Sequence, residues 1–77
     1  MKQLKVLGTG CAKCNSLYAL TDQAARSLGL EYELVKVEDI NQIIEFGVMI
    51  TPALVVDGEV KCSGKLPSVE QIKGYLS

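Results

Sequence analysis

The sequence lacks histidine and tryptophan, and its 77 residues contain only three cysteines. A closed structural zinc site needs four ligands, usually cysteine and histidine side chains, so we do not expect one copy of this chain to build one. Two copies that each contribute a pair of cysteines could still share a soft metal ion. An odd number of cysteines also does not suit a framework of structural disulfides.

The sequence also has no large net charge and no long apolar run. Eight basic and nine acidic residues give a net charge of −1, and the lysines are scattered between acids, which argues against a nucleic-acid partner. No apolar run approaches the roughly 18 residues of a membrane-spanning helix. The first six residues reach charged side chains too soon for the core of a signal peptide. We therefore expect a monomeric cytoplasmic protein, in a compartment where thiols are kept reduced.

The pattern of apolar residues predicts one α/β domain over residues 1–77, with the element order β-α-β-α-β-β-α. Strands are expected at 2–8, 31–37, 53–56 and 60–63, and helices at 11–28, from 39 to about 47, and from 69 onward. The Asp57-Gly58 turn predicts an antiparallel hairpin, and Ser68 with Gln71 forms a capping-box pattern. Crossover rules then give a three-layer sandwich around a mixed four-stranded sheet of order 2-1-3-4. The first and last helices should cover one face and the second helix the other.

Two details of this pattern concern individual side chains. The short second helix has an apolar set that consists of Ile40, Ile43, Ile44 and either Phe46 or Gly47. Strict alternation along the fourth strand places Val60 and Cys62 on the same face of the sheet. Cys62 is then either a small core residue or a third redox thiol. A direct disulfide to the N-terminal cysteines is not expected, because a separation of about 10 Å across two strands exceeds the reach of a disulfide.

The other two cysteines form the motif Cys11-Ala12-Lys13-Cys14, between the first strand and the first helix. A cysteine at a helix start faces unpaired backbone N–H groups and the positive end of the helix dipole, which favour the thiolate. The second cysteine, one turn later, is near enough to close a disulfide with the first. Lys13 either lowers the pKa of Cys11 by charge attraction or is a solvated surface lysine. The motif predicts a redox dithiol, with Cys11 attacking and Cys14 resolving.

Three features of the chain together resemble the thioredoxin-like superfamily: the element order, a Gly-x-Gly-Cys-x-x-Cys start, and an Ile-Thr-Pro sequence that ends at Pro52. The closest likeness is to the small glutaredoxin-sized proteins of bacteria and archaea. The resemblance implies a cis peptide between Thr51 and Pro52 that packs against the disulfide. It also implies that Gly10, Thr51, Pro52 and Gly64 form the substrate-binding surface. Read without the resemblance, Pro52 is equally an ordinary turn proline.

The chain departs from that superfamily at several positions. Gly10 stands where thioredoxins have a tryptophan, and Lys5 stands where they have a buried acid that assists proton transfer. The dipeptide between the cysteines is neither the Gly-Pro of thioredoxins nor the Pro-Tyr of glutaredoxins. We find no residue that supports glutathione binding.

The predicted function is a cytoplasmic thiol–disulfide oxidoreductase that serves electron transport and cell redox homeostasis. Its expected partners are disulfide-containing client proteins and a reductant, either a thioredoxin-reductase-like protein or a small thiol. Thiol exchange needs no metal or organic cofactor. The alternative is a non-enzymatic module that binds a soft metal or a partner protein through the same cysteines.

Overall fold

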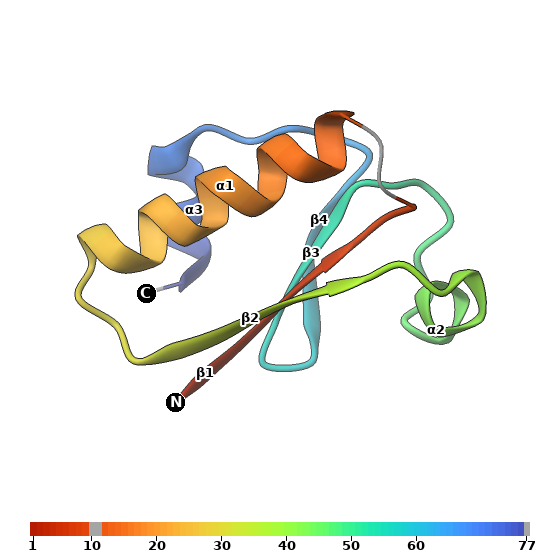
Figure 1. The fold of residues 1–77 in the computed structure, drawn as a ribbon, viewed down its shortest axis with the longest axis horizontal. Coiled ribbons are helices and arrows are strands. Elements are labelled where there is room, and N and C mark those ends of the chain that lie inside the picture. The colour runs from red at the N-terminus through yellow and green to blue at the C-terminus, as the bar shows by residue number, and fades with distance from the viewer. Residues whose placement is uncertain (10–11, 77) are drawn as a thin grey trace.

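The computed structural model describes residues 1–9 and 12–76. Its elements are β1 (Lys2–Leu7), α1 (Ala12–Ser27), β2 (Tyr32–Val37), α2 (Ile40–Glu45), β3 (Ala53–Val56), β4 (Glu59–Ser63) and α3 (Val69–Leu76). The four strands form one sheet in the order β2-β1-β3-β4 (Figure 1). β1 pairs parallel with β2 and antiparallel with β3, and β3 pairs antiparallel with β4. The predicted order of elements and strands is confirmed.

α1 and α3 cover one face of the sheet, as predicted. α1 buries Leu17, Ala24 and Ala25 against this face, and α3 buries Ile72 and Leu76. The strand residues that meet these helices are Leu4, Val6, Leu54 and Val56. The start of α3 is capped reciprocally: the Ser68 N–H donates to Gln71 Oε1, and the Gln71 N–H donates to Ser68 Oγ. Among the described residues, none of the helices is both long and apolar enough to cross a bilayer.

α2 covers the other face, as predicted, but only part of its apolar set is buried there. Only Ile43 is buried, in a cluster with Leu7 and Val55, among others. Ile40 and Ile44 are 56% and 63% exposed. A helix of six residues makes fewer than two turns, so a single side chain can point straight at the sheet. The apolar set of the second helix therefore does not form one buried face, because two of its three isoleucines are exposed.

The β3–β4 hairpin corrects one prediction. Leu54 pairs with Cys62, but Val55 pairs with Val60, so Lys61 is an extra residue in β4. Cys62 consequently packs on the α1/α3 side of the sheet and Val60 on the α2 side. The expectation that these two side chains share a face is wrong, because the bulge breaks the alternation.

The Asp57 side chain in the hairpin turn contacts the start of β1. These contacts lead to a prediction about the stability of the fold in acid. Its carboxylate accepts a hydrogen bond from the Gln3 N–H at 2.9 Å and lies 3.6 Å from Lys2 Nζ. The Gln3 hydrogen bond, with smaller contributions from Lys2, lowers the pKa of Asp57. A pKa that is lower in the folded chain stabilises the fold above the usual carboxyl range, and this contribution is lost as the pH falls through the folded pKa.

Asp57→Asn keeps an oxygen acceptor and a residue that tolerates positive φ, but it removes the charge. We expect the variant to be less stable than the parent protein at about pH 7 and the difference to vanish at about pH 2. Urea unfolding midpoints at the two pH values measure this. A difference that is the same at both would contradict a role for the ionised carboxylate.

Candidate functional site

Cys14 lies in the first turn of α1, and its side chain is 4% exposed. Unpaired backbone N–H groups and the positive end of the helix dipole are concentrated in this turn. None of the described residues in this first turn of α1 is acidic, and the side chain of Lys13 is exposed to solvent. The predicted site residues Gly10 and Cys11 lie outside the described residues.

Gly8 faces the side chain of Cys14 across the loop. A β-carbon placed on Gly8 would lie 2.1 Å from Cys14 Sγ and 3.9 Å from Thr51 Cβ. The end of β1, the start of α1 and the segment before β3 therefore converge at the sulfur of Cys14. Sequence reasoning placed Gly8 at the end of the first predicted strand and missed this contact.

The structure brings Thr51, Pro52 and Gly64 together. The Thr51–Pro52 peptide is cis, and Pro52 is buried. The Pro52 carbonyl accepts a hydrogen bond from the Gly64 N–H at 2.8 Å. Gly64 has φ +71°, and a β-carbon there would lie 2.7 Å from Ile50 Cγ2. A glycine is thus required at 64 both by its backbone conformation and by the contact with Ile50.

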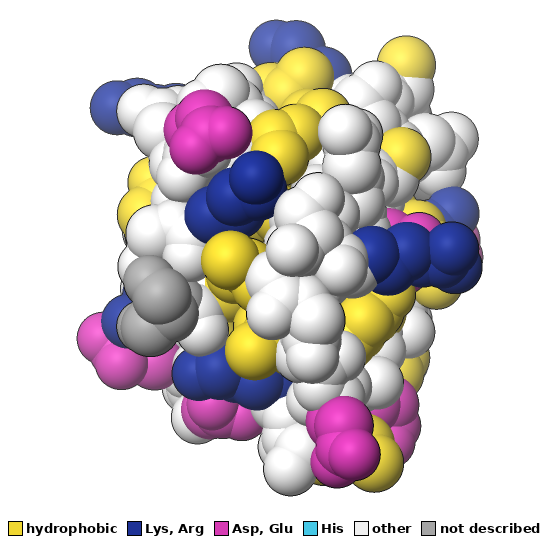
Figure 2. Space-filling model, turned by 90° about the vertical axis from the view of Figure 1, so that its left-hand side faces the viewer, with side chains coloured by type: hydrophobic (Ala, Val, Ile, Leu, Met, Phe, Trp, Pro, Cys, Tyr) yellow, Lys and Arg dark blue, Asp and Glu magenta, His cyan; other side chains and the backbone are white. Residues whose placement is uncertain are grey.

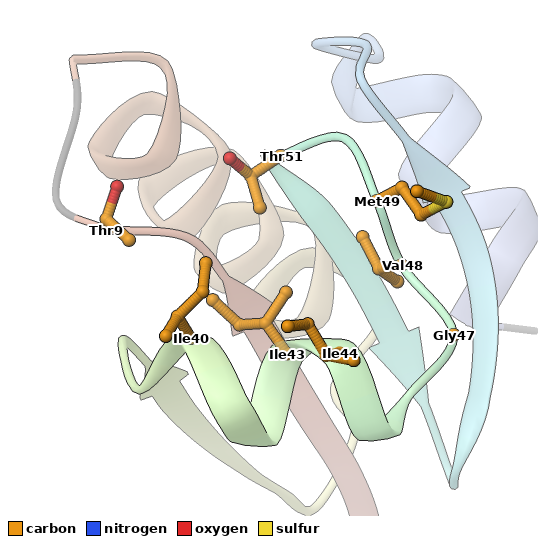
Figure 3. A pocket seen from close by; sticks show the side chains of 8 residues that line it. All are labelled: Thr9, Ile40, Ile43, Ile44, Gly47, Val48, Met49 and Thr51. Atoms are coloured by element: carbon orange, nitrogen blue, oxygen red, sulfur yellow. The ribbon is translucent and has the colours of Figure 1, made fainter.

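An apolar groove of about 570 Å³ opens beside these residues. Figure 3 shows Thr9 and Thr51 at its upper rim and the three isoleucines of α2 below them. The remaining lining comes from Gly47, Val48 and Met49, of which Met49 is 97% exposed. None of the described residues that line the groove carries a charged side chain. Sequence reasoning missed it, although an isoleucine-rich helix too short to bury all its isoleucines was an available signal.

Lys5 and Lys36 each lie over an aromatic ring. Lys5, at the position where thioredoxins have an acid, places its Nζ 5.2 Å from the centroid of the Phe46 ring. Lys36 donates to Asn15 Oδ1 at 2.9 Å, and its Nζ lies 5.1 Å from the centroid of the Tyr18 ring. Figure 2 shows one face of the molecule, on which basic and acidic side chains are interspersed with hydrophobic ones. On that face no patch of a single sign gathers.

Cys62 is not among the described residues that line the groove. Its side chain is half-buried on the α1/α3 side, and burial raises the pKa of the thiol, partly offset by a hydrogen bond with the Leu54 backbone. A raised pKa leaves less of the reactive thiolate at neutral pH. Within residues 1–9 and 12–76, no group of three metal-binding side chains gathers closely enough to hold an ion.

Known proteins resemble this chain over nearly its whole length. The sequence model of a family described as a thioredoxin domain matches residues 2–77. A protein of Methanocaldococcus jannaschii named thioredoxin is 44% identical over 76 residues, which cover 99% of this chain and 87% of that protein. A thioredoxin of Methanothermobacter thermautotrophicus is 40% identical over 77 residues, and the match covers 100% of both chains.

Proposed function

The chain belongs to the thioredoxin family, and from this premise we propose that it exchanges disulfides with client proteins through Cys11 and Cys14. The observation that carries the proposal is the burial of Cys14 in the first turn of α1, against Gly8 and beside an uncharged apolar groove. A buried sulfur cannot attack a large external disulfide, but it can attack a sulfur held next to it. Cys14 is therefore assigned the second, intramolecular step.

The proposed reaction runs in two exchanges. The Cys11 thiolate attacks one sulfur of the client disulfide, forms a mixed disulfide with it and releases the other client sulfur as a thiolate. The Cys14 thiolate then attacks Cys11, closes the Cys11–Cys14 disulfide and releases the second client sulfur. Two electrons pass from the dithiol to the client, and the two protons that the cysteines lose end on the client thiols. Lys13 favours the Cys11 thiolate by charge attraction.

The groove and its rim are proposed to hold the client. An extended segment beside the client cysteine would pair with the backbone at Thr51, next to Pro52, as a strand added to an edge. Gly10 carries no side chain and would let that segment approach closely, and Gly64, whose N–H donates to the Pro52 carbonyl, would hold the backbone beside Thr51 in place. An aliphatic side chain of the client would enter the groove between Ile40, Ile44 and Met49, which lie exposed on the free protein. The oxidised dithiol would be regenerated by a reductase or a small thiol.

Turnover of insulin with dithiothreitol tests the proposal. The reduced protein should accelerate insulin precipitation, and elemental analysis of the same sample should find much less than one metal ion per two chains. Stoichiometric zinc or copper without turnover would instead support the metal-binding alternative, in which two copies share an ion through their cysteine pairs.

Cys62 is predicted to be dispensable for this cycle, because its thiol is half-buried and burial raises the pKa of that thiol, which leaves less of the reactive thiolate. Cys62→Ala should keep insulin reduction within about threefold and lower the free energy of unfolding by about 1 kcal/mol for the lost side chain. Urea unfolding and the insulin assay on the same preparation measure both. Loss of most activity in a folded Cys62→Ala protein would make Cys62 a third redox thiol.

A further inference from the structure

We propose that Gly8 is a positioning residue for the resolving thiol, and that the absence of a side chain at this position sets the rate at which Cys14 closes the disulfide. The inference rests on the proposed function, since it assigns the second exchange step to Cys14. It adds a residue that the two-cysteine motif does not contain.

The contact is too close for any side chain. A β-carbon on Gly8 would lie 2.1 Å from Cys14 Sγ and 3.1 Å from Cys14 Cβ. The first separation is far below the van der Waals contact of a carbon and a sulfur atom. The second is also tighter than an ordinary contact. The Cys14 sulfur therefore occupies the space that a side chain at position 8 would need.

The backbone does not explain this glycine. Gly29, Gly47, Gly58 and Gly64 all have positive φ, where glycine is favoured for conformational reasons. Gly8 is not among the residues with positive φ. An alanine would fit its backbone conformation, so the space taken by the Cys14 sulfur is the remaining reason for a glycine.

Neither partner can move away freely. The Gly8 N–H donates to the Val37 carbonyl at 3.0 Å, directly after Leu7, which pairs with strands on both sides. α1 is held by Leu17 and Ala24, both fully buried. A β-carbon at position 8 would therefore displace the sulfur itself, by rotating it or by shifting the first turn of α1. A displacement of about 1 Å in a reacting group costs on the order of a hundredfold in rate.

Gly8→Ala tests this, with Gly74→Ala as the matched control. Gly74 lies in α3, and a β-carbon there meets nothing within 4 Å. Rapid mixing of the reduced protein with a disulfide-containing fluorescent peptide follows the formation and the decay of the mixed disulfide. In Gly8→Ala we expect formation at the parent rate and decay at least tenfold slower, on the order of a hundredfold. In Gly74→Ala both rates should match the parent protein.

A double-mutant cycle separates this role from a general loss of stability. Gly8→Ala should lower the melting temperature of the parent protein and lower that of Cys14→Ala much less, because the displaced sulfur is then missing. If Gly8→Ala alone fails to fold, a folded Gly8→Ala/Cys14→Ala protein supports the contact, and an unfolded one overturns it.

Unchanged decay in a folded Gly8→Ala protein, or equal destabilisation in both backgrounds, would also overturn the inference. Failure of the proposed function looks different, because the parent protein and Gly74→Ala would then form no mixed disulfide at all. The melting-temperature cycle would still report whether the sulfur fills the space at Gly8.

Discussion

Replacing Cys14 by serine is expected to stop turnover and to leave the protein covalently linked to its clients. Cys11 can still form the mixed disulfide, but the buried sulfur that resolves it is gone. An intramolecular attack has an effective concentration that external thiols do not reach, so multiple-turnover reduction should fall by on the order of a thousandfold or more. Cys11→Ser should abolish turnover as well, yet without trapping clients.

Non-reducing electrophoresis with a purified client disulfide distinguishes the two variants. Cys14→Ser should give a stable covalent adduct that dithiothreitol removes, and Cys11→Ser should give almost none. Cys62→Ser is the matched control, because it removes the one cysteine outside the motif, and it should behave like the parent protein. Equal trapping by the Cys11 and Cys14 variants would show that the proposed order of attack is wrong.

A charge placed in the groove is expected to weaken reduction of protein clients selectively. Ile44 is 63% exposed, so Ile44→Glu should cost little stability. Burial of an aliphatic side chain in the groove contributes about 1.5–3 kcal/mol, and a carboxylate there would remove this and add a desolvation cost. We therefore expect kcat/KM for insulin to fall by about 10–100-fold. Reduction of a small aromatic disulfide, which does not need the groove, should change by less than about threefold.

Leu28→Glu is the matched control for Ile44→Glu. Leu28 is 39% exposed and follows the C-terminal end of α1, far from α2 (Figure 1). The same charge there should leave both substrates unaffected. If the two variants reduce insulin equally well, the groove does not bind the client. If Ile44→Glu slows both substrates to the same extent, the charge acts on the dithiol and not on client binding.

The fold could be predicted because its local signals agree with one another. The Asp57-Gly58 pair takes positive φ at both residues, as a two-residue hairpin turn requires. Ser68 and Gln71 cap α3 as their spacing indicates. Alternation and helical spacing then set which side chains enter the core, and crossover rules set the strand order.

The parts that could not be predicted depend on contacts between distant segments. The extra residue in β4 depends on how Val55 and Val60 meet, and no local pattern specifies it. The exposure of Ile44 follows from the small number of turns in α2, and the groove appears only when α2 lies opposite Thr51. The role of Gly8 could likewise not be predicted, because it depends on where the fold places the sulfur of Cys14, six residues further along the chain.

The shortness of α2 bears on how the groove meets different clients. This helix has six residues, and Ile43 is the only one of them that is buried. An element held by so few apolar contacts opens locally at a free energy well below that of global unfolding, and its amide protons exchange with solvent early. One wall of the groove can therefore shift to accept side chains of different size, while β1, β3 and α1 keep the Cys14 sulfur in place. Under the proposed function, a fixed sulfur beside an adjustable wall would let one site accept client disulfides with different neighbouring side chains.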